Sequence, residues 1–138
     1  MADAVSASEA VPVAEFRAAL RGFMRTSERN ARAAGLTPQR YLLLLMIKGS
    51  PDGSERSTVT DLAERLQLAQ STVTELVSRA EEVGLISRER SSDDGRIAYL
   101  RLTDEGDRRL AEVFSSNERE RHALAQAFEH LQSTGLPT

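Results

Sequence analysis

The chain has 138 residues, of which 40% are hydrophobic and 28% are charged, and its formal net charge at pH 7 is −3. This length suits one globular domain and is small for an enzyme with a substrate domain of its own. Because the chain has no cysteine, disulfides, thiolate metal sites and peroxide sensing through cysteine are excluded. The apolar block 41–47 is far shorter than the ~20 residues that span a bilayer, and the N-terminus does not resemble a signal peptide. We therefore expect a cytoplasmic protein with no membrane partner.

The first part of the chain predicts a tail, two helices and a loop. Residues 1–10 show no pattern and predict a flexible N-terminal tail. An amphipathic helix is expected over 11–34, where it stops before a glycine. A second helix follows the cap Thr37 and covers 38–48, with proline at its first position. The polar stretch 49–57 contains one proline and two glycines and predicts a loop.

Two short amphipathic helices joined by a tight turn come next. In the first, apolar residues recur at steps of three and four, and Thr58 with Asp61 three residues later is typical of a capping pair. Ser57 is an alternative cap for this helix. The second helix, expected over 70–83, has the same apolar spacing and ends at Gly84. The order and spacing of these helices predict a helix-turn-helix.

The face of the second helix opposite its apolar stripe is polar. Its members are Gln70, Ser71, Thr74, Glu75, Ser78 and Arg79. Short hydroxyl side chains let a helix approach a DNA groove and donate to phosphates and base edges. Taken alone, the same pattern is equally typical of a solvated face.

A basic hairpin is predicted after these helices. Residues 86–90 and 96–102 form two short runs, and the second alternates apolar and polar positions as a half-buried strand does. Asp94-Gly95 between them predicts a tight turn, because glycine accepts positive φ. The hairpin carries Arg88, Arg90, Arg96 and Arg101, which suits the negative potential of a minor groove. A generic surface hairpin is the alternative interpretation.

The succession from Asp61 to Gly106 resembles the MarR family of bacterial transcriptional regulators. The most specific features are Asp-Gly-Arg at 94–96 and Leu-Thr-x-x-Gly at 102–106, which are similar to the family's wing and its continuation. The resemblance implies a mainly α fold with a small β-hairpin wing (α+β), that is, a winged helix-turn-helix at 57–103. It also implies that long N- and C-terminal helices, 11–48 and 104–132, form a dimerisation region within one domain, 11–138.

The resemblance also implies roles for particular residues. Arg96 would enter the minor groove, and Asp94 would orient an arginine, either Arg96 or Arg79. The residues expected to contact DNA are Gln70, Ser71, Thr72, Thr74, Glu75, Ser78, Arg79, Arg88, Arg90, Asp94 and Arg96. The chain departs from the family at Ala69, where a serine cap is frequent, so a contribution of typically ~1 kcal/mol is missing there.

The C-terminal part predicts a long helix that reaches a partner. Thr103 caps it, and three acidic residues in its first turn favour the positive helix end. A helix of about 28 residues is ~42 Å long, more than a domain of this size needs to cover its core. The first helix carries a row of arginines at steps of four, whose like charges repel. Acidic residues of the last helix are candidate partners, either within the chain or across a dimer. A solvated arginine face is the alternative, because exposed ion pairs contribute little. These residues are Arg17, Arg21, Arg25 and Arg29, with Glu112, Glu118, Glu120 and Glu129.

We therefore expect a homodimer that binds double-stranded DNA at a pseudo-palindromic operator, acting as a repressor. By the resemblance, a small aromatic or anionic effector would bind beside the dimerisation helices. Its candidate lining residues are Phe16, Phe23, Met24, Tyr41, Leu45 and Arg65. Burial in the core is the alternative role for most of them.

Catalysis is not expected. Two histidines, His122 and His130, are eight positions apart and do not form a metal site, and no phosphate loop, nucleophile elbow or zinc motif occurs. We expect no cofactor. The segment 58–85 is locally acidic, since it holds two arginines against five acidic residues. This acidity leaves open a winged-helix module that binds protein, or one that binds DNA without a ligand.

Overall fold

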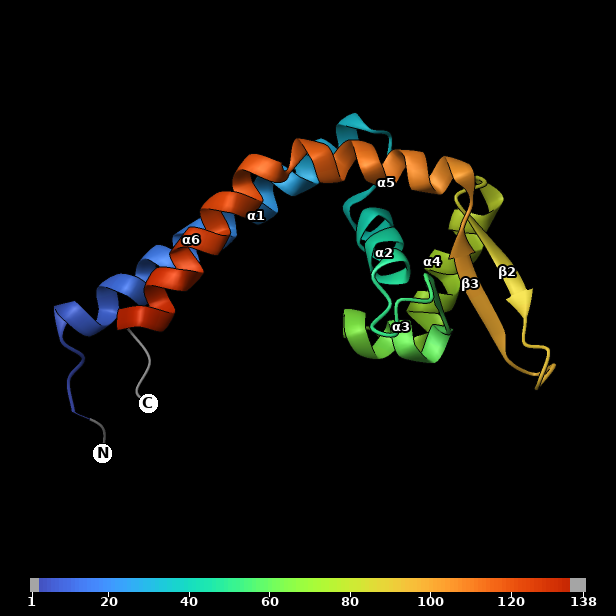
Figure 1. Ribbon diagram of the computed structural model, residues 1–138, viewed down its shortest axis with the longest axis horizontal. Helices are drawn as coiled ribbons and strands as arrows, with labels where there is room; N and C mark the ends of the chain where they lie inside the picture. Colours follow the sequence, from blue (N-terminus) through green and yellow to red (C-terminus); the bar gives the residue numbers. More distant parts are fainter. Residues whose placement is uncertain (1–2, 135–138) are drawn as a thin grey trace. The chain divides into compact units, whose positions relative to one another are not determined.

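The computed structural model describes residues 3–134. This part of the chain contains six helices and one three-stranded antiparallel sheet, so the expected mainly α fold with a small β wing is confirmed (Figure 1). The chain forms two compact units, one from its two ends, up to Asn30 and from Phe114, and one from Ala31–Val113. No helix in the described range is long and apolar enough to cross a membrane.

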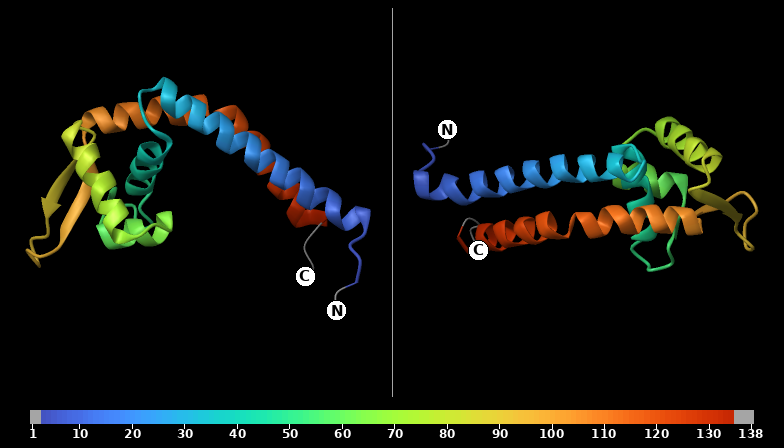
Figure 2. Two further views of the ribbon diagram at one scale, coloured as in Figure 1. Left: turned by 180° about the vertical axis from the view of Figure 1, so that it is seen from behind. Right: turned by 90° about the horizontal axis from the view of Figure 1, so that it is seen from above.

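The unit made by the chain ends contains most of α1 (Ala7–Ala33) and all of α6 (Glu118–Thr134), which run side by side in opposite directions (Figures 1 and 2). The rings of Phe16 and Phe128 lie 5.8 Å apart. Glu15 Oε2 lies 2.8 Å from His130 Nδ1. An aromatic contact and a polar pair therefore hold the two helices together.

Helix α1 begins at Ala7, earlier than the expected start at residue 11, so residues 7–10 are helical and not a tail. A side-chain cap by Ser6 explains this start. Ser6 Oγ accepts a hydrogen bond from the Glu9 backbone N–H (3.1 Å) and donates to the Glu9 carboxylate (2.8 Å). Residues 1–2 of the expected tail lie outside the described range.

The single long C-terminal helix expected from the sequence is wrong, because Asn117 separates α5 (Asp104–Ser116) from α6. The Asn117 side chain is fully buried; its Nδ2 donates to Ser27 Oγ (3.1 Å), and its Oδ1 accepts from Asn30 Nδ2 (2.8 Å). A buried amide needs such partners. Asparagine is also a weak helix former, so the helix is interrupted where this amide turns inward to α1.

In the second unit, three helices and the sheet share one hydrophobic core. The helices are α2 (Pro38–Lys48), α3 (Val59–Leu66) and α4 (Gln70–Glu82), and the fully buried side chains include Leu43, Leu44, Ile47, Leu62, Val73, Val77 and Leu100. Thr58 Oγ1 accepts from the Asp61 N–H at 3.2 Å, which confirms the expected cap of α3. Ser57 is not the cap, because it lies in a strand.

The sheet has the order β1-β3-β2, with β1 (Arg56–Ser57), β2 (Ile86–Arg90) and β3 (Ala98–Leu102). β3 pairs with β2 as predicted for the wing, and it also pairs with β1, where Ser57 lies opposite Leu100. The end of the predicted loop 49–57 is therefore a strand. Two residues are too few to show the alternation by which strands are recognised.

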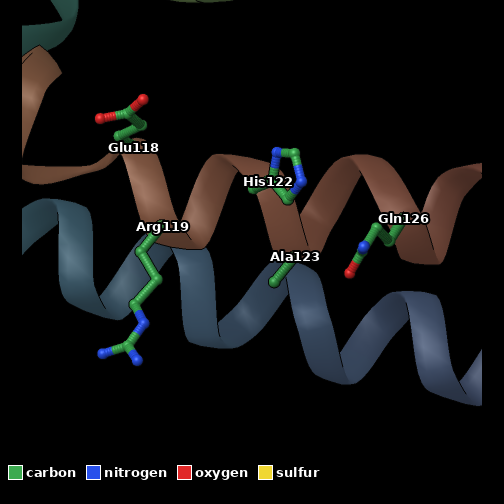
Figure 3. A pocket seen from close by; sticks show the side chains of 5 residues that line it. All are labelled: Glu118, Arg119, His122, Ala123 and Gln126. Atoms are coloured by element: carbon green, nitrogen blue, oxygen red, sulfur yellow. The ribbon is translucent and has the colours of Figure 1, made fainter.

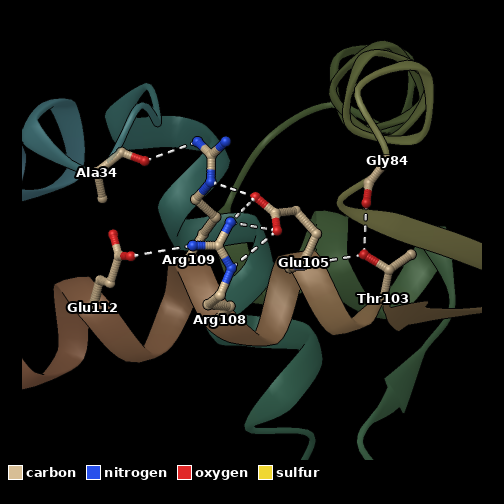
Figure 4. A network of polar contacts seen from close by, with 8 residues as sticks. Ala34, Gly84, Thr103, Glu105, Arg108, Arg109 and Glu112 are labelled. Carbon is tan, nitrogen blue, oxygen red and sulfur yellow. Dashed lines mark hydrogen bonds and ion pairs between the residues drawn. The ribbon is translucent and has the colours of Figure 1, made fainter.

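The joint between α4, the wing and α5 depends on Thr103 and Gly106 (Figure 4). Thr103 Oγ1 accepts from the Gly106 N–H (3.1 Å) and donates to the Gly84 carbonyl (2.6 Å), while the Thr103 N–H donates to the Leu85 carbonyl (3.0 Å). Gly84 has φ +76°, which confirms it as the stop of α4. A Cβ on Gly106 would lie 2.1 Å from the Leu85 oxygen. This close backbone approach requires glycine.

A second contact fixes α5 against the end of α1. Arg109 Nη1 donates to the Ala34 carbonyl (2.9 Å), and its Nε donates to Glu105 (2.8 Å), as Figure 4 shows. Glu105 also accepts from Arg108 at 2.6 Å. The pKa of Glu105 is lowered, first by the hydrogen bond from Arg108 and next by that from Arg109. The first turns of α5 are thus held by two sets of contacts, one from Thr103 to the end of α4 and one from Arg109 to Ala34 after α1.

We expect Gly106→Ala to lower the free energy of unfolding by about 1–3 kcal/mol, because the added methyl group forces the Leu85 backbone away. Denaturant unfolding followed by circular dichroism measures this change. Gly22→Ala is the matched control: its Cβ would meet nothing within 4 Å. It lies within α1, so alanine should stabilise it by roughly 0.5–1 kcal/mol. Equal effects of the two substitutions would contradict the proposed role of Gly106.

Candidate nucleic-acid interface

Helix α4 presents one polar face to solvent and buries the other. Val73, Val77 and Ala80 are fully buried. The expected contact residues lie on the other side; all are exposed except Ser78, which is half-buried. They are Gln70, Ser71, Thr72, Thr74, Glu75, Ser78 and Arg79. The structure therefore brings these seven side chains to one accessible helix surface.

The N-terminus of α4 has no side-chain cap, as the sequence predicted from Ala69. The helix nevertheless starts at Gln70, whose Nε2 donates to Thr60 Oγ1 of α3 at 3.3 Å. This contact anchors the start of α4 to the preceding helix. The uncapped amide groups of the first turn are free to donate to an anion.

The arginine that Asp94 orients is Arg96 and not Arg79. Asp94 Oδ1 accepts from the Arg96 backbone N–H (3.0 Å) and Nε (3.1 Å), and Oδ2 accepts from Nη2 (3.3 Å). Arg79 instead pairs with Glu75 at 2.8 Å along α4. The Arg96 side chain is 91% exposed, so its guanidinium is held by one edge and projects into solvent.

The wing tip is a longer loop than the predicted tight turn. Gly95 does not have a positive φ, so the reason given for a glycine there is wrong. The loop is closed by Ser91, whose N–H donates to the Ile97 carbonyl (2.9 Å), and by Ile97, whose N–H donates to the Asp94 carbonyl (3.0 Å). β3 accordingly begins at Ala98 and not at residue 96.

The other wing arginines have internal partners. Arg88 Nε donates to Glu81 of α4 (2.8 Å), and Arg90 Nη1 donates to the Gly95 carbonyl within the loop (2.6 Å). Arg101 contacts the Ser54 carbonyl at 3.4 Å. Arg88 and Arg101 therefore fasten the wing to its neighbours. Their charge is less available to DNA than that of Arg96.

One arginine of this surface was not predicted. Arg56 lies on β1, with its guanidinium 4.1 Å from the centre of the Tyr99 ring and 3.8 Å from Glu89. It braces the outer face of the wing sheet by a cation–π contact and an ion pair. The sequence around Arg56 indicates a loop, so it does not predict that Arg56 lies on a strand of the wing sheet.

The six candidate effector residues are divided between the two units. Phe16, Phe23 and Met24 lie on α1 in the unit of the chain ends. In the other unit, Tyr41 is 5% exposed, Leu45 packs against the same core, and Arg65 donates to the Met46 and Gly49 carbonyls at 2.8 and 3.2 Å. Tyr41 and Leu45 are thus core residues, and Arg65 caps the end of α2.

Of the six candidates, Arg65 lines a hollow of about 370 Å³ together with Asp61 and Glu64 of α3. Two further hollows of the described surface involve other residues. One of about 500 Å³ lies beside α6 and is lined by Glu118, Arg119, His122, Ala123 and Gln126 (Figure 3). Another, of about 320 Å³, lies between the start of α2 and α4, where Arg40 and Arg79 contribute to the wall. None of the six candidate effector residues lines either hollow.

Comparisons with known proteins agree with this geometry. Residues 34–97 match the model of the MarR family. The transcriptional repressor MdtR of Bacillus subtilis is 37% identical over 81 residues, which are 59% of this chain and 50% of MdtR. The organic hydroperoxide resistance transcriptional regulator of the same organism is 37% identical over 71 residues, 51% of this chain and 46% of that regulator. The chain spans about half the length of these curated relatives.

Solved structures share the fold over most of the chain. YusO of Bacillus subtilis has a TM-score of 0.66 at 24% identity, covering 95% of this chain and 100% of YusO. A mutant of MarR from E. coli, complexed with operator DNA, has a TM-score of 0.66 at 16% identity, covering 88% and 90%. The segment 34–97 is therefore similar to the MarR family, and the chain shares the fold of these solved structures.

We expect the Asp94 carboxyl to titrate below its usual range, because the Arg96 side chain, and next its backbone N–H, lower its pKa. The ion pair between the Asp94 carboxylate and Arg96 is therefore present at neutral pH, and it is lost as the pH falls through the lowered pKa of Asp94. Carboxyl carbon NMR measures this titration in wild type and in Arg96→Ala, where the pKa of Asp94 should rise. Asp52 is an internal control, since hydrogen bonds from Ser54 and then Ser50 lower its pKa to about 2. An Asp94 pKa that does not change in Arg96→Ala would contradict the assignment.

Proposed function

We propose that this protein is a sequence-specific DNA-binding transcriptional regulator. The observation that carries the proposal is the bidentate contact of Asp94 with Arg96, which holds an almost fully exposed guanidinium at the wing tip. In this proposal α4 enters a major groove with its polar face, and Arg96 enters the adjacent minor groove. Base contacts come from hydroxyl and amide side chains, such as Ser71, Thr74 and Gln70.

The balance of charge fits selective binding. Glu75 neutralises Arg79, and Glu81 neutralises Arg88, so the surface around α4 has little free positive charge. Asp94 pairs with Arg96 as well, but the Arg96 side chain is 91% exposed, and Arg90 bonds only the Gly95 carbonyl. Attraction to phosphate then depends on these two arginines and on the amide groups at the start of α4. A surface of this kind binds poorly to DNA in general. It gains affinity where base contacts add to a few phosphate contacts.

We further propose a homodimer joined through the N- and C-terminal helices, 11–48 and 104–132, which binds a pseudo-palindromic operator. Two-fold symmetry of the protein implies two half-sites in the DNA. The MarR complex with operator DNA supports a DNA partner. Because the partner of such a protein is chromosomal, its place of action is the cytoplasm.

A repressor role is proposed from the repressor MdtR, and a small aromatic or anionic effector from the family. For the effector site, Phe16, Phe23 and Met24 remain candidates, since Met24 is 53% exposed. Tyr41, Leu45 and Arg65 are weaker candidates because each has a structural role. The chain lacks cysteine, so a response to oxidants through a thiol is not part of the proposal.

A duplex from the region upstream of the protein's own coding sequence tests the proposal. Wild type should bind it in preference to an unrelated duplex, and the affinity should fall as salt rises. Arg96→Ala should weaken binding about 5- to 150-fold, equivalent to about 1–3 kcal/mol. Fluorescence anisotropy at several salt concentrations measures both effects.

Arg119→Ala is the matched control, because Arg119 is an exposed arginine of α6 outside the proposed interface. It should bind the duplex as wild type does. Equal affinity of wild type for both duplexes at every salt concentration would exclude the regulator. It would favour the alternative of a winged-helix module that binds protein.

A further inference from the structure

Four arginines form a continuous basic row along α1, which we call the arginine ridge. Its members are Arg17, Arg21, Arg25 and Arg29, and all four are exposed. They are four positions apart, so neighbouring members lie on one stripe of the helix with an axial rise of about 6 Å between them. The ridge is therefore about 18 Å long. The exposed alanines Ala14 and Ala18 flank it, and their short side chains leave the guanidinium groups accessible.

The ridge has no acidic partner within the described residues. No ion pair or side-chain hydrogen bond there involves any of its four arginines. The acids proposed from the sequence do not meet them: Glu112 pairs with Arg108 at 3.7 Å, and Glu118, Glu120 and Glu129 make no ion pair with the ridge. Pairing within the chain, one of the alternatives left open by the sequence, is therefore wrong for the described part.

The ridge also lies away from the partner helix of α1. Phe16 contacts Phe128, and Ser27 contacts Asn117, so these positions mark the side of α1 that packs within its unit. At about 100° per residue, Arg21 and Arg25 lie roughly opposite to them. Within its own chain, the basic stripe is therefore exposed.

Like charges at steps of four destabilise a helix. The helix dipole favours cations only in the last turn, so it does not explain Arg17 and Arg21 in the middle of α1. Glu28 is the one acidic residue that lies near this stripe. A row of this kind is stabilised when a dense anion lies along it. Guanidinium groups match phosphates by their fork of donors.

We propose that the arginine ridge is a second DNA-binding surface that contacts the phosphate backbone of a duplex without reading its sequence. Duplex DNA carries one charge per about 1.7 Å of its axis. A straight row about 18 Å long therefore faces many phosphates at once. The overall charge of −3 does not describe α1, which carries five arginines and three acidic residues. The proposal does not depend on the wing, since the ridge belongs to the other unit.

The test compares two double variants of the full chain on a duplex of unrelated sequence. Arg21→Gln with Arg25→Gln removes two charges from the ridge, and glutamine keeps the helix propensity of α1. Arg108→Gln with Arg119→Gln is the matched control, because it removes two exposed charges outside the ridge. Anisotropy at several salt concentrations gives the slope of log affinity against log salt. The sedimentation mass of each protein is measured in parallel.

The ridge variant should show a slope shallower by about 1.8 for each ridge engaged, since each phosphate contact contributes about 0.9. Its mass should equal that of wild type, near two chains, and the control should keep the wild-type slope. An unchanged slope in the ridge variant would overturn the proposal. A fall in mass to one chain would also overturn it, because the arginines would then meet acids of a second copy.

The result is separable from the regulator proposal. If wild type binds operator and unrelated duplex equally, the sequence-specific function fails, whatever the slope of the ridge variant. If operator preference is present and the ridge variant keeps the wild-type slope, only the ridge fails. Arg96→Ala, with its intact ridge, should retain the part of the salt slope that the ridge contributes.

Discussion

The close backbone contact between Gly106 and Leu85 is the constraint on which the winged helix-turn-helix depends. With this contact in place, the Thr103 hydroxyl caps α5 by accepting from the Gly106 N–H. The same hydroxyl donates to the carbonyl of Gly84, which follows α4. The end of α4, the last residue of the wing and the start of α5 therefore share one joint. Because this joint is made of backbone and one short side chain, it leaves little freedom for the angle between α4 and the wing.

The arginines of this unit have two different roles: some connect its elements to one another, and one is exposed at the wing tip. Arg88 and Glu81 connect the wing to α4, Arg56 packs on Tyr99, and Arg109 connects α5 to the end of α1. At the wing tip, Asp94 holds the Arg96 guanidinium on one edge by an ion pair. The Arg96 side chain nevertheless stays 91% exposed, more than the paired Arg79 and Arg108, which are 63% and 62% exposed. In the proposed complex, a protein of net charge −3 contacts DNA through a few accessible arginines and not through a large excess of positive charge.

Much of this unit was predictable, because its cues are local. Thr58 and Gly84 mark helix ends by their own chemistry, and the alternation around Leu100 marks β3. The features that were missed depend on residues far apart in the sequence. The break at Asn117 requires Ser27 and Asn30, and β1 is recognisable only by its pairing with β3. The early start of α1 is different, since Ser6 caps the helix and the spacing Ser-x-x-Glu of Ser6 and Glu9 is visible in the sequence.

In the proposed complex, α4 and the wing tip contact DNA as one rigid block. Hydrogen exchange of the protein, measured free and bound to its operator duplex, tests whether they do. We expect slower exchange on binding in the first turns of α4, residues 70–78, together with the wing loop 91–97. Protection of the outer sheet face around Arg56 and Arg101, with no change in these two segments, would contradict it.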